Sequence, residues 1–159
     1  MRLLALLVVL ALAGASQAQD ESRLLPLDEA FAKGVLIVSA SDKACIRFDV
    51  YFATNNAQRA RGLMFVRDMP ETTGMLFIYE SDDYLSMWMK NTFIPLDILF
   101  VRADGSVSSI AYNTEPQSLR SITALEPVRY VLELNAGVAE KFSIDKYSLL
   151  DWDGMPPVE

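Results

Sequence analysis

The sequence predicts a mainly β fold, a single-domain antiparallel β-sandwich or partly closed barrel with two or three short helices. Three observations support this class. Apolar and polar residues alternate in several short segments, which is the pattern of strands with one buried face. Turn signals such as Asp104-Gly105 separate these segments at regular intervals. The regular succession of strands and helices that builds a parallel sheet is absent.

The alternation is clearest in residues 45–53, where Ile46, Phe48, Val50 and Phe52 share one phase. The expected strands span residues 35–40, 45–53, 75–80, 84–89, 96–101, 107–113, 128–134 and 147–152. Their spacing predicts three hairpins, which join the first strand to the second, the third to the fourth and the fifth to the sixth.

Three short helices are expected between these strands. They cover residues 27–33, 54–62 and 136–142. Gly34 and Gly62 stop the first two helices, Thr54 or Asn55 caps the second, and Asn135 can cap the third.

The segment 114–127 contains two prolines and has no clear period. A loop of this length in a compact domain is often functional.

The first residues have the layout of a cleavable secretory signal. Arg2 is followed by an uncharged apolar run from Leu3 to Ala13 and by small residues at Ser16 and Ala18. The apolar run is too short for a membrane-spanning helix, which needs about 20 residues. Cleavage near Ala18 predicts a periplasmic or secreted protein with no stable membrane anchor.

The predicted organisation is therefore a signal peptide and one β-rich domain. It assigns residues 1–18 to the signal peptide, 19–33 to a leader, 34–152 to the domain and 153–159 to a C-terminal tail.

The composition excludes several kinds of catalytic site, metal site and partner. The chain has no histidine, which excludes Ser-His and Cys-His catalysis and ordinary zinc sites. Its net charge of −7 repels nucleic acid, so no nucleic-acid partner is expected. Cys45 is the single cysteine, so no internal disulfide can form, and its position at a strand start predicts an exposed thiol or a dimer contact. No cofactor motif is present, and the sequence does not indicate an oligomeric state.

Several motifs, taken in order, resemble a bacterial and archaeal family, domain of unknown function 192. They fall on Gly62-Leu63-Met64, Gly74-Met75-Leu76-Phe77, Trp88–Thr92, Ile94–Asp97 and Val131-Leu132-Glu133. Phe65-Val66 departs from the pattern, because an arginine commonly comes sooner there; Arg67 can take that place. The resemblance covers roughly residues 35–152 and implies a β-rich, often exported domain with no established activity.

The stretch SMWMKNTFIPLD, residues 86–97, is the candidate ligand site. Trp88 would form an aromatic wall for a small polar ligand such as a sugar. The polar groups would come from Lys90, Asn91, Thr92 and Asp97, with Arg61 as a further contributor. The alternative is structural: Asp97 accepts backbone N–H bonds or pairs with a basic residue and so pins a turn. A partner protein is the other possible occupant.

A strand over 84–89 places Leu85, Met87 and Met89 on one face and Trp88 on the other. The methionines are therefore expected in the core, where Met often fills gaps. The functional alternative is a Cu(I) carrier, because thioethers favour that ion. Its candidate ligands are Met87, Met89, Met64 and Met75.

The remaining function class is a carboxylate-based hydrolase, with Asp97, Glu115 and Glu133 as candidates. Glu133 is expected to be an exposed strand charge. Arg59 and Arg61 are expected to face different directions, one of them near the site or both in solvent.

Overall fold

The computed structural model describes residues 25–41 and 43–152. The chain divides into two units, Met1–Ala30 and Phe31–Glu159. The described part of the first unit contains helix α2 (Leu27–Ala30). The predicted signal peptide and the C-terminal tail lie outside the described residues.

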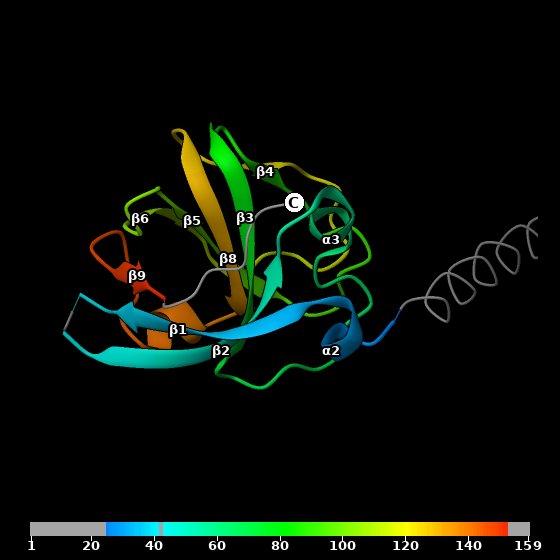
Figure 1. The fold of residues 1–159 in the computed structure, drawn as a ribbon, viewed down its shortest axis with the longest axis horizontal. Coiled ribbons are helices and arrows are strands. Elements are labelled where there is room, and N and C mark those ends of the chain that lie inside the picture. The colour runs from blue at the N-terminus through cyan, green and yellow to red at the C-terminus, as the bar shows by residue number, and fades with distance from the viewer. Residues whose placement is uncertain (1–24, 42, 153–159) are drawn as a thin grey trace, which may run out of the picture. The chain divides into compact units, whose positions relative to one another are not determined.

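The second unit is built on a seven-stranded sheet with the order β6-β5-β8-β3-β2-β1-β9 (Figure 1). Its strands are β1 (Ala32–Ser39), β2 (Cys45–Ala53), β3 (Thr73–Asp83), β5 (Leu96–Val101), β6 (Val107–Ala111), β8 (Val128–Asn135) and β9 (Leu149–Asp151). A small second sheet pairs β4 (Ser86–Met87) with β7 (Ile122–Thr123), and the unit also holds helices α3 (Asn56–Arg61) and α4 (Val138–Lys141). The predicted mainly β class is confirmed.

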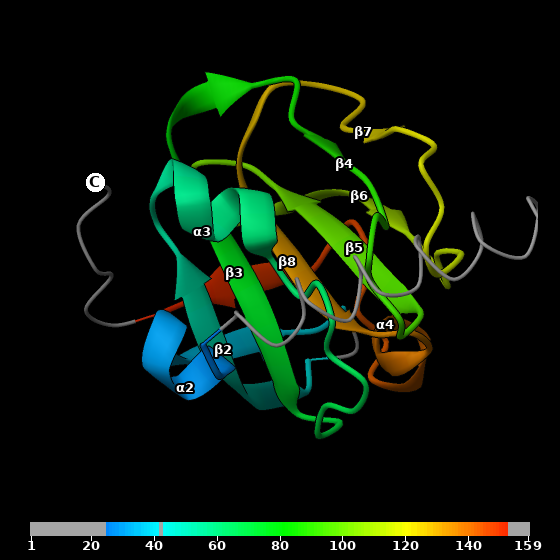
Figure 2. The ribbon, with the colours of Figure 1, turned by 90° about the vertical axis from the view of Figure 1, so that its right-hand side faces the viewer.

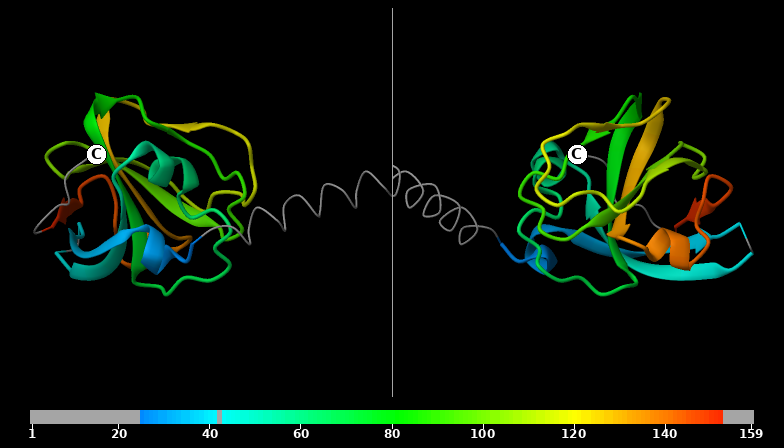
Figure 3. Two further views of the ribbon diagram at one scale, coloured as in Figure 1. Left: turned by 45° about the vertical axis from the view of Figure 1, so that its right-hand side comes forward. Right: turned by 180° about the vertical axis from the view of Figure 1, so that it is seen from behind.

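The sheet curls so that its two edge strands, β6 and β9, come close to each other (Figure 3). The amide of Leu150 donates to the carbonyl of Gly105 at 2.8 Å, and the amide of Val107 donates to Ser148 at 3.0 Å. These bonds join the start of β6 and the turn before it to the region of β9. The expected partly closed barrel is therefore formed by one strongly curled sheet.

Two of the three predicted hairpins are present, β1–β2 and β5–β6. The second predicted hairpin is wrong, because β4 pairs with β7 and not with β3. Instead β3 pairs in parallel with β2 and antiparallel with β8. Helix α3 lies in the connection from β2 to β3, and such a crossover is what a parallel pair requires.

The sheet is buried on both faces at its centre. Residues inside the curl form one continuous core with these buried members: Leu36, Val38, Phe48, Val50, Phe52, Leu76, Ile78, Leu99, Val101, Val107, Tyr130, Leu132 and Leu134, among others. On the opposite face, Met75, Phe77, Ile98 and Val131 are also buried. Figure 2 shows α3 lying over this second face, in front of β3 and β8.

The helix caps differ in how well they were predicted. Asn55 caps α3, where its side chain accepts from the Gln58 amide at 2.9 Å. The predicted cap at Asn135 is wrong: this residue ends β8, and its side-chain amide donates to the Met69 carbonyl at 2.8 Å. Gly137 takes the N-cap position of α4.

Gly34 was predicted to stop a helix, and this prediction is wrong. It lies within β1, next to the ring of Phe52. A Cβ added at Gly34 would come within 2.3 Å of that ring, so only glycine allows this approach. Gly34→Ala is expected to lower the free energy of unfolding by about 1–3 kcal/mol through overpacking. Urea denaturation measures this loss. The double variant with Phe52→Leu should recover part of it, and a double variant as unstable as Gly34→Ala would contradict this cause.

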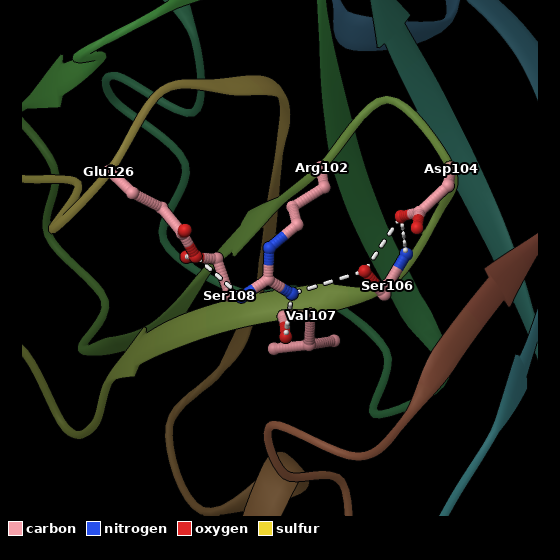
Figure 4. A network of polar contacts seen from close by, with 6 residues as sticks. All are labelled: Arg102, Asp104, Ser106, Val107, Ser108 and Glu126. Atoms are coloured by element: carbon pink, nitrogen blue, oxygen red, sulfur yellow. Dashed lines mark hydrogen bonds and ion pairs between the residues drawn. The ribbon is translucent and has the colours of Figure 1, made fainter.

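The Arg102 side chain connects the loop after β7 to the β5–β6 hairpin through polar contacts (Figure 4). Its guanidinium donates to the Val107 carbonyl at 3.0 Å and forms an ion pair with Glu126. The hydroxyl of Ser108 donates to the same carboxylate at 2.5 Å. The Ser108 bond and then the Arg102 bond lower the pKa of Glu126. Since both charged side chains are partly exposed, the network positions the loop more than it stabilises the fold.

Candidate functional site

A cavity of about 290 Å³ lies on the outer face of the sheet, where α3 covers β3 and β8. Helix α3 and the turn after it form one wall, and the β4 segment forms the opposite wall. The floor is the sheet itself, with Phe77, Tyr79 and Glu133. The lining of the cavity therefore mixes polar and charged side chains with apolar ones, and the polar part is at least as large.

Glu133 is the buried acid of this cavity, with a relative exposure of 4%. It lies on β8 between Met75 of β3 and Ile98 of β5, its cross-strand neighbours. Burial raises the pKa of its carboxyl to about 8. Among the described residues, this carboxyl makes no hydrogen bond or ion pair. The prediction that Glu133 is an exposed strand charge is wrong, because β8 is a central strand whose two faces are both covered.

Arg59 is held rigidly at the cavity wall. Its guanidinium donates to the carbonyls of Thr54 at 2.7 Å and Ile78 at 2.8 Å and to the Asn56 side chain at 2.7 Å. It also lies 5.0 Å from the centre of the Tyr79 ring. Burial raises the pKa of Tyr79, the charge of Arg59 lowers it, and Glu133 raises it further. Tyr79 is therefore within electrostatic range of both Arg59 and Glu133.

Arg61 is half-buried and lines the same cavity. Its guanidinium lies 5.2 Å from the centre of the Phe31 ring, and burial lowers its pKa. Arg59 packs against β3, whereas Arg61 reaches Phe31. The two arginines thus extend in different directions, as expected from their spacing, and still contribute to one cavity.

The β4 segment has the alternation that was predicted for it. Leu85, Met87 and Met89 are buried, and the residues between them are exposed. Trp88 is 48% exposed and lies at the cavity, and Lys90 places its amine 5.0 Å from the Trp88 ring. Because the alternate residues are buried, the Trp88 side chain is left on the exposed face of the segment, at the cavity.

Of the six candidate site residues, Arg61, Trp88 and Thr92 line the cavity, whereas Lys90, Asn91 and Asp97 are not among its lining residues. Asn91 adopts a left-handed turn conformation with φ 55°. Its carbonyl accepts from the amide of Phe65 at 2.8 Å.

Asp97 lies on the other side of the sheet. It is fully buried and is paired with Leu134, a member of the core inside the curl. One carboxyl oxygen accepts from the Asn113 amide at 2.9 Å, and the other accepts from the Ala139 amide at 3.0 Å. Asp97 therefore accepts backbone N–H bonds, as the structural alternative to a ligand-binding role predicted. The two bonds hold the end of the β5–β6 hairpin and α4 in place.

Residues 36–152 match the model of DUF192, a family described as "Uncharacterized ACR". The chain belongs to the DUF192 family. No curated protein matches the sequence.

Two solved structures resemble this DUF192 chain. A protein from Sinorhizobium meliloti 1021, proposed to be a transcription regulator, is 37% identical with a TM-score of 0.77. The match covers 79% of this chain and 97% of the S. meliloti chain. A protein of unknown function from Novosphingobium aromaticivorans DSM 12444 is 31% identical with a TM-score of 0.76, over 81% of this chain and 91% of its own. These comparisons establish the family and the fold of the chain, and they do not assign an activity to it.

The methionines of the DUF192 domain are divided between two places. Met64 and Met87 line the cavity. Met89 is fully buried, and its sulfur accepts from the Thr114 hydroxyl at 3.2 Å. Met75 is fully buried on β3 opposite Glu133. Within residues 25–41 and 43–152, no three His, Cys, Asp or Glu side chains are grouped closely enough to hold a metal ion.

Two further observations concern the surface and the helices. Cys45 is exposed, which is compatible with both predictions made for it, an exposed thiol and a dimer contact. None of the helices in the described part of the chain has the length and apolar character that crossing a bilayer requires.

Proposed function

We propose that the DUF192 domain binds a small polar ligand, such as a sugar, in the cavity between α3, β4 and β8. The observation that carries this proposal is the Glu133 carboxyl, which is buried at the cavity floor with no protein partner among the described residues. A buried polar group without a hydrogen bond is costly, and a ligand hydroxyl would satisfy it. Trp88 offers the aromatic face on which the apolar side of a sugar ring packs.

The proposed setting is outside the cytoplasm. The signal-like sequence of residues 1–18 supports export, with cleavage near Ala18 and release into the periplasm or medium. Sugars and cell-wall fragments are the polar ligands to be expected there. With a net charge of −7 the chain would repel DNA, so the transcriptional role proposed for the S. meliloti protein is not extended to it.

A thermal-shift screen of the purified protein against sugars, peptidoglycan fragments and Cu(I) tests the proposal. A ligand that binds only the folded state raises the melting temperature. The variant Trp88→Ala/Lys90→Ala is expected to keep its own melting temperature within a few degrees, since both side chains are exposed, and to lose the shift produced by the ligand.

The matched control is Lys146→Ala/Tyr147→Ala, another exposed cation–aromatic pair, whose amine lies 5.1 Å from the ring. This control should retain the full shift, because neither residue lines the cavity. An equal loss of the shift in both double variants would contradict a site at Trp88, and unfolding of the Trp88 variant would show that the segment is structural.

A Cu(I) carrier is the second candidate. It is supported by two methionines, Met64 and Met87, which line one cavity and carry the thioether groups that Cu(I) favours. In the same screen, a shift produced by Cu(I) but by no sugar, and lost in Met64→Leu, would select this function.

A further inference from the structure

The small sheet of β4 and β7 has an outward face that lies beside the cavity. The chain around β4 alternates between exposed and buried residues from 84 to 89, and the chain around β7 alternates between exposed and more covered residues from 121 to 125. Figure 2 shows the two strands side by side. Their exposed side chains therefore share one face, here called the β4–β7 face, which consists of Tyr84, Ser86, Trp88, Ser121, Thr123 and Leu125.

An aromatic ring lies at each end of this face on the β4 side. Ser86 is paired with Thr123 at the centre, and the exposed positions on the two sides of Ser86 are Tyr84 and Trp88. These aromatic residues are four positions apart, which separates their Cα atoms by about 13 Å in an extended chain. Tyr84 is 60% exposed and Trp88 is 48% exposed. A single sugar ring cannot cover both aromatic rings, whereas a chain of several linked sugars can.

Three hydroxyl groups of the same face bond with one another. The Ser86 hydroxyl bonds with those of Ser121 and Thr123, the latter at 3.1 Å, and the Ser121 and Thr123 oxygens are 3.3 Å apart. Such a closed set can use each of its O–H groups internally, and each oxygen then keeps a lone pair for a further donor. A ligand rich in hydroxyl groups supplies these donors, whereas an apolar partner surface would bury the oxygens without them.

The face continues into the cavity and consists of uncharged side chains. Ser86 and Trp88 belong to the face and also line the cavity, whose floor holds the buried carboxyl of Glu133. None of the six side chains of the face is charged, although charged residues make up 22% of the chain. The amine of Lys90 lies beyond the face at one end, 5.0 Å from the Trp88 ring. A neutral surface of this kind is complementary to a neutral ligand.

We infer that the ligand is a linear, uncharged oligosaccharide that lies along the β4–β7 face from Trp88 to Tyr84 and places one terminal sugar in the cavity. The apolar faces of two of its sugar rings pack on the two aromatic rings, and its hydroxyl groups donate to the hydroxyl oxygens between them. The cavity volume of about 290 Å³ lies at the lower end of the range for ligand sites, so the cavity holds one end of the chain. This inference rests on the proposed function and extends the site from one sugar to several linked sugars.

Sugars of one type but different length test the inference. N-acetylglucosamine with chitotetraose, and glucose with cellotetraose, form two uncharged pairs. Isothermal titration of the purified protein should give at least about tenfold tighter binding of the tetramer in at least one pair, because the tetramer reaches the second aromatic ring. A gain of this size exceeds the roughly fourfold statistical advantage of four units that compete for a site of one unit.

Substitution at Tyr84 assigns the gain to the second aromatic ring. Tyr84→Ala should weaken binding of the tetramer about tenfold and leave binding of the monomer within about twofold, since Tyr84 does not line the cavity. Tyr84→Phe should bind the tetramer as the parent does, because the ring remains. Trp88→Ala should weaken binding of both sugars, because Trp88 belongs to the face and to the cavity. The matched control is Tyr147→Ala: Tyr147 is 75% exposed and lies outside the face and the cavity, so both affinities should stay unchanged.

The outcomes separate the inference from the proposed function. Binding of a monomer with no more than the statistical gain in its tetramer would overturn the inference and leave the proposed function standing. A larger gain that survives Tyr84→Ala would also overturn it. If none of the four sugars binds at about 10 mM, the inference is rejected, and the wider screen alone decides the proposed function. A dimer of the ligand-free protein that light scattering detects and that Tyr84→Ala dissociates would assign the face to a second copy of the chain, and this too would overturn the inference.

Discussion

Asp97→Ala is expected to lower the free energy of unfolding by about 3 kcal/mol or more, because each buried group left unsatisfied costs about 1–3 kcal/mol. Asp97 is fully buried, and its two carboxyl oxygens accept from the backbone amides of Asn113 and Ala139. Alanine would leave both amides without an acceptor inside the protein. Since these amides belong to the end of the β6 hairpin and to α4, both elements should loosen together. Chemical denaturation measures the loss, and hydrogen exchange at the two amides locates it.

Asp97→Asn should cost less than Asp97→Ala, because the amide keeps one oxygen acceptor while its NH₂ group faces the other donor. The matched control is Asp49→Ala. Asp49 pairs with Arg47 on the surface, where both side chains are about 60% exposed, and such pairs contribute roughly 0–1 kcal/mol. If Asp97→Ala were no more destabilising than Asp49→Ala, the structural role of this carboxyl would be contradicted.

The strand periodicity predicted local features well and long-range pairings poorly. The alternation over residues 84–89 correctly separated the buried Leu85, Met87 and Met89 from the exposed Trp88, because side-chain direction in a strand is a local property. The same segment pairs with β7, which is more than 30 residues away in the sequence. This pairing could not be predicted from the alternation within the segment. The parallel pairing of β2 and β3 was missed for a similar reason, since one short helix gives little sign of a crossover.

Of the six candidate residues, Arg61, Trp88 and Thr92 line the cavity. Trp88 and Thr92 are close in sequence and share the cavity, whereas Asp97 lies across the sheet from it. The register explains this division. Asp97 is paired with Leu134 and Ile98 with Glu133, and successive residues of a strand point to opposite faces. Which face each residue occupies depends on partners that the sequence does not name.

Glu133 could have been found from one signal in the sequence. It is the single charge within the apolar run Val131-Leu132-Glu133-Leu134. In an edge strand, such a residue faces solvent. In a central strand, as β8 is, both faces are buried, and the charge then marks a site or a structural partner.

The free energy of unfolding is expected to fall as the pH rises from about 4.5 to about 8, and Glu133 is the cause. Its pKa is raised from the ordinary 4.5 to about 8 by burial, so the folded state holds a proton that the unfolded state has already lost in this interval. Stability therefore decreases with rising pH, by at most about 1.4 kcal/mol per unit from this group. The loss ends above the folded pKa, where both states are deprotonated.

Glu133→Gln isolates this effect, because glutamine imitates the protonated acid in shape and does not titrate. The variant should be nearly as stable as the parent below pH 4.5 and more stable than the parent above pH 8, with a much flatter profile between. Glu80→Gln, at an exposed position of β3, should keep the profile of the parent.

Two other acids with shifted pKa values do not imitate this profile. The pKa values of Asp104 and Glu126 are lowered, so their contributions are lost as the pH falls below the ordinary carboxyl range and leave the interval from 5 to 8 unaffected. Urea titrations of the parent and both variants at several pH values measure the slopes. A parent whose stability does not change between pH 5 and 8, or a Glu133→Gln variant with the slope of the parent, would show that the carboxyl at the cavity floor is not held in its protonated form.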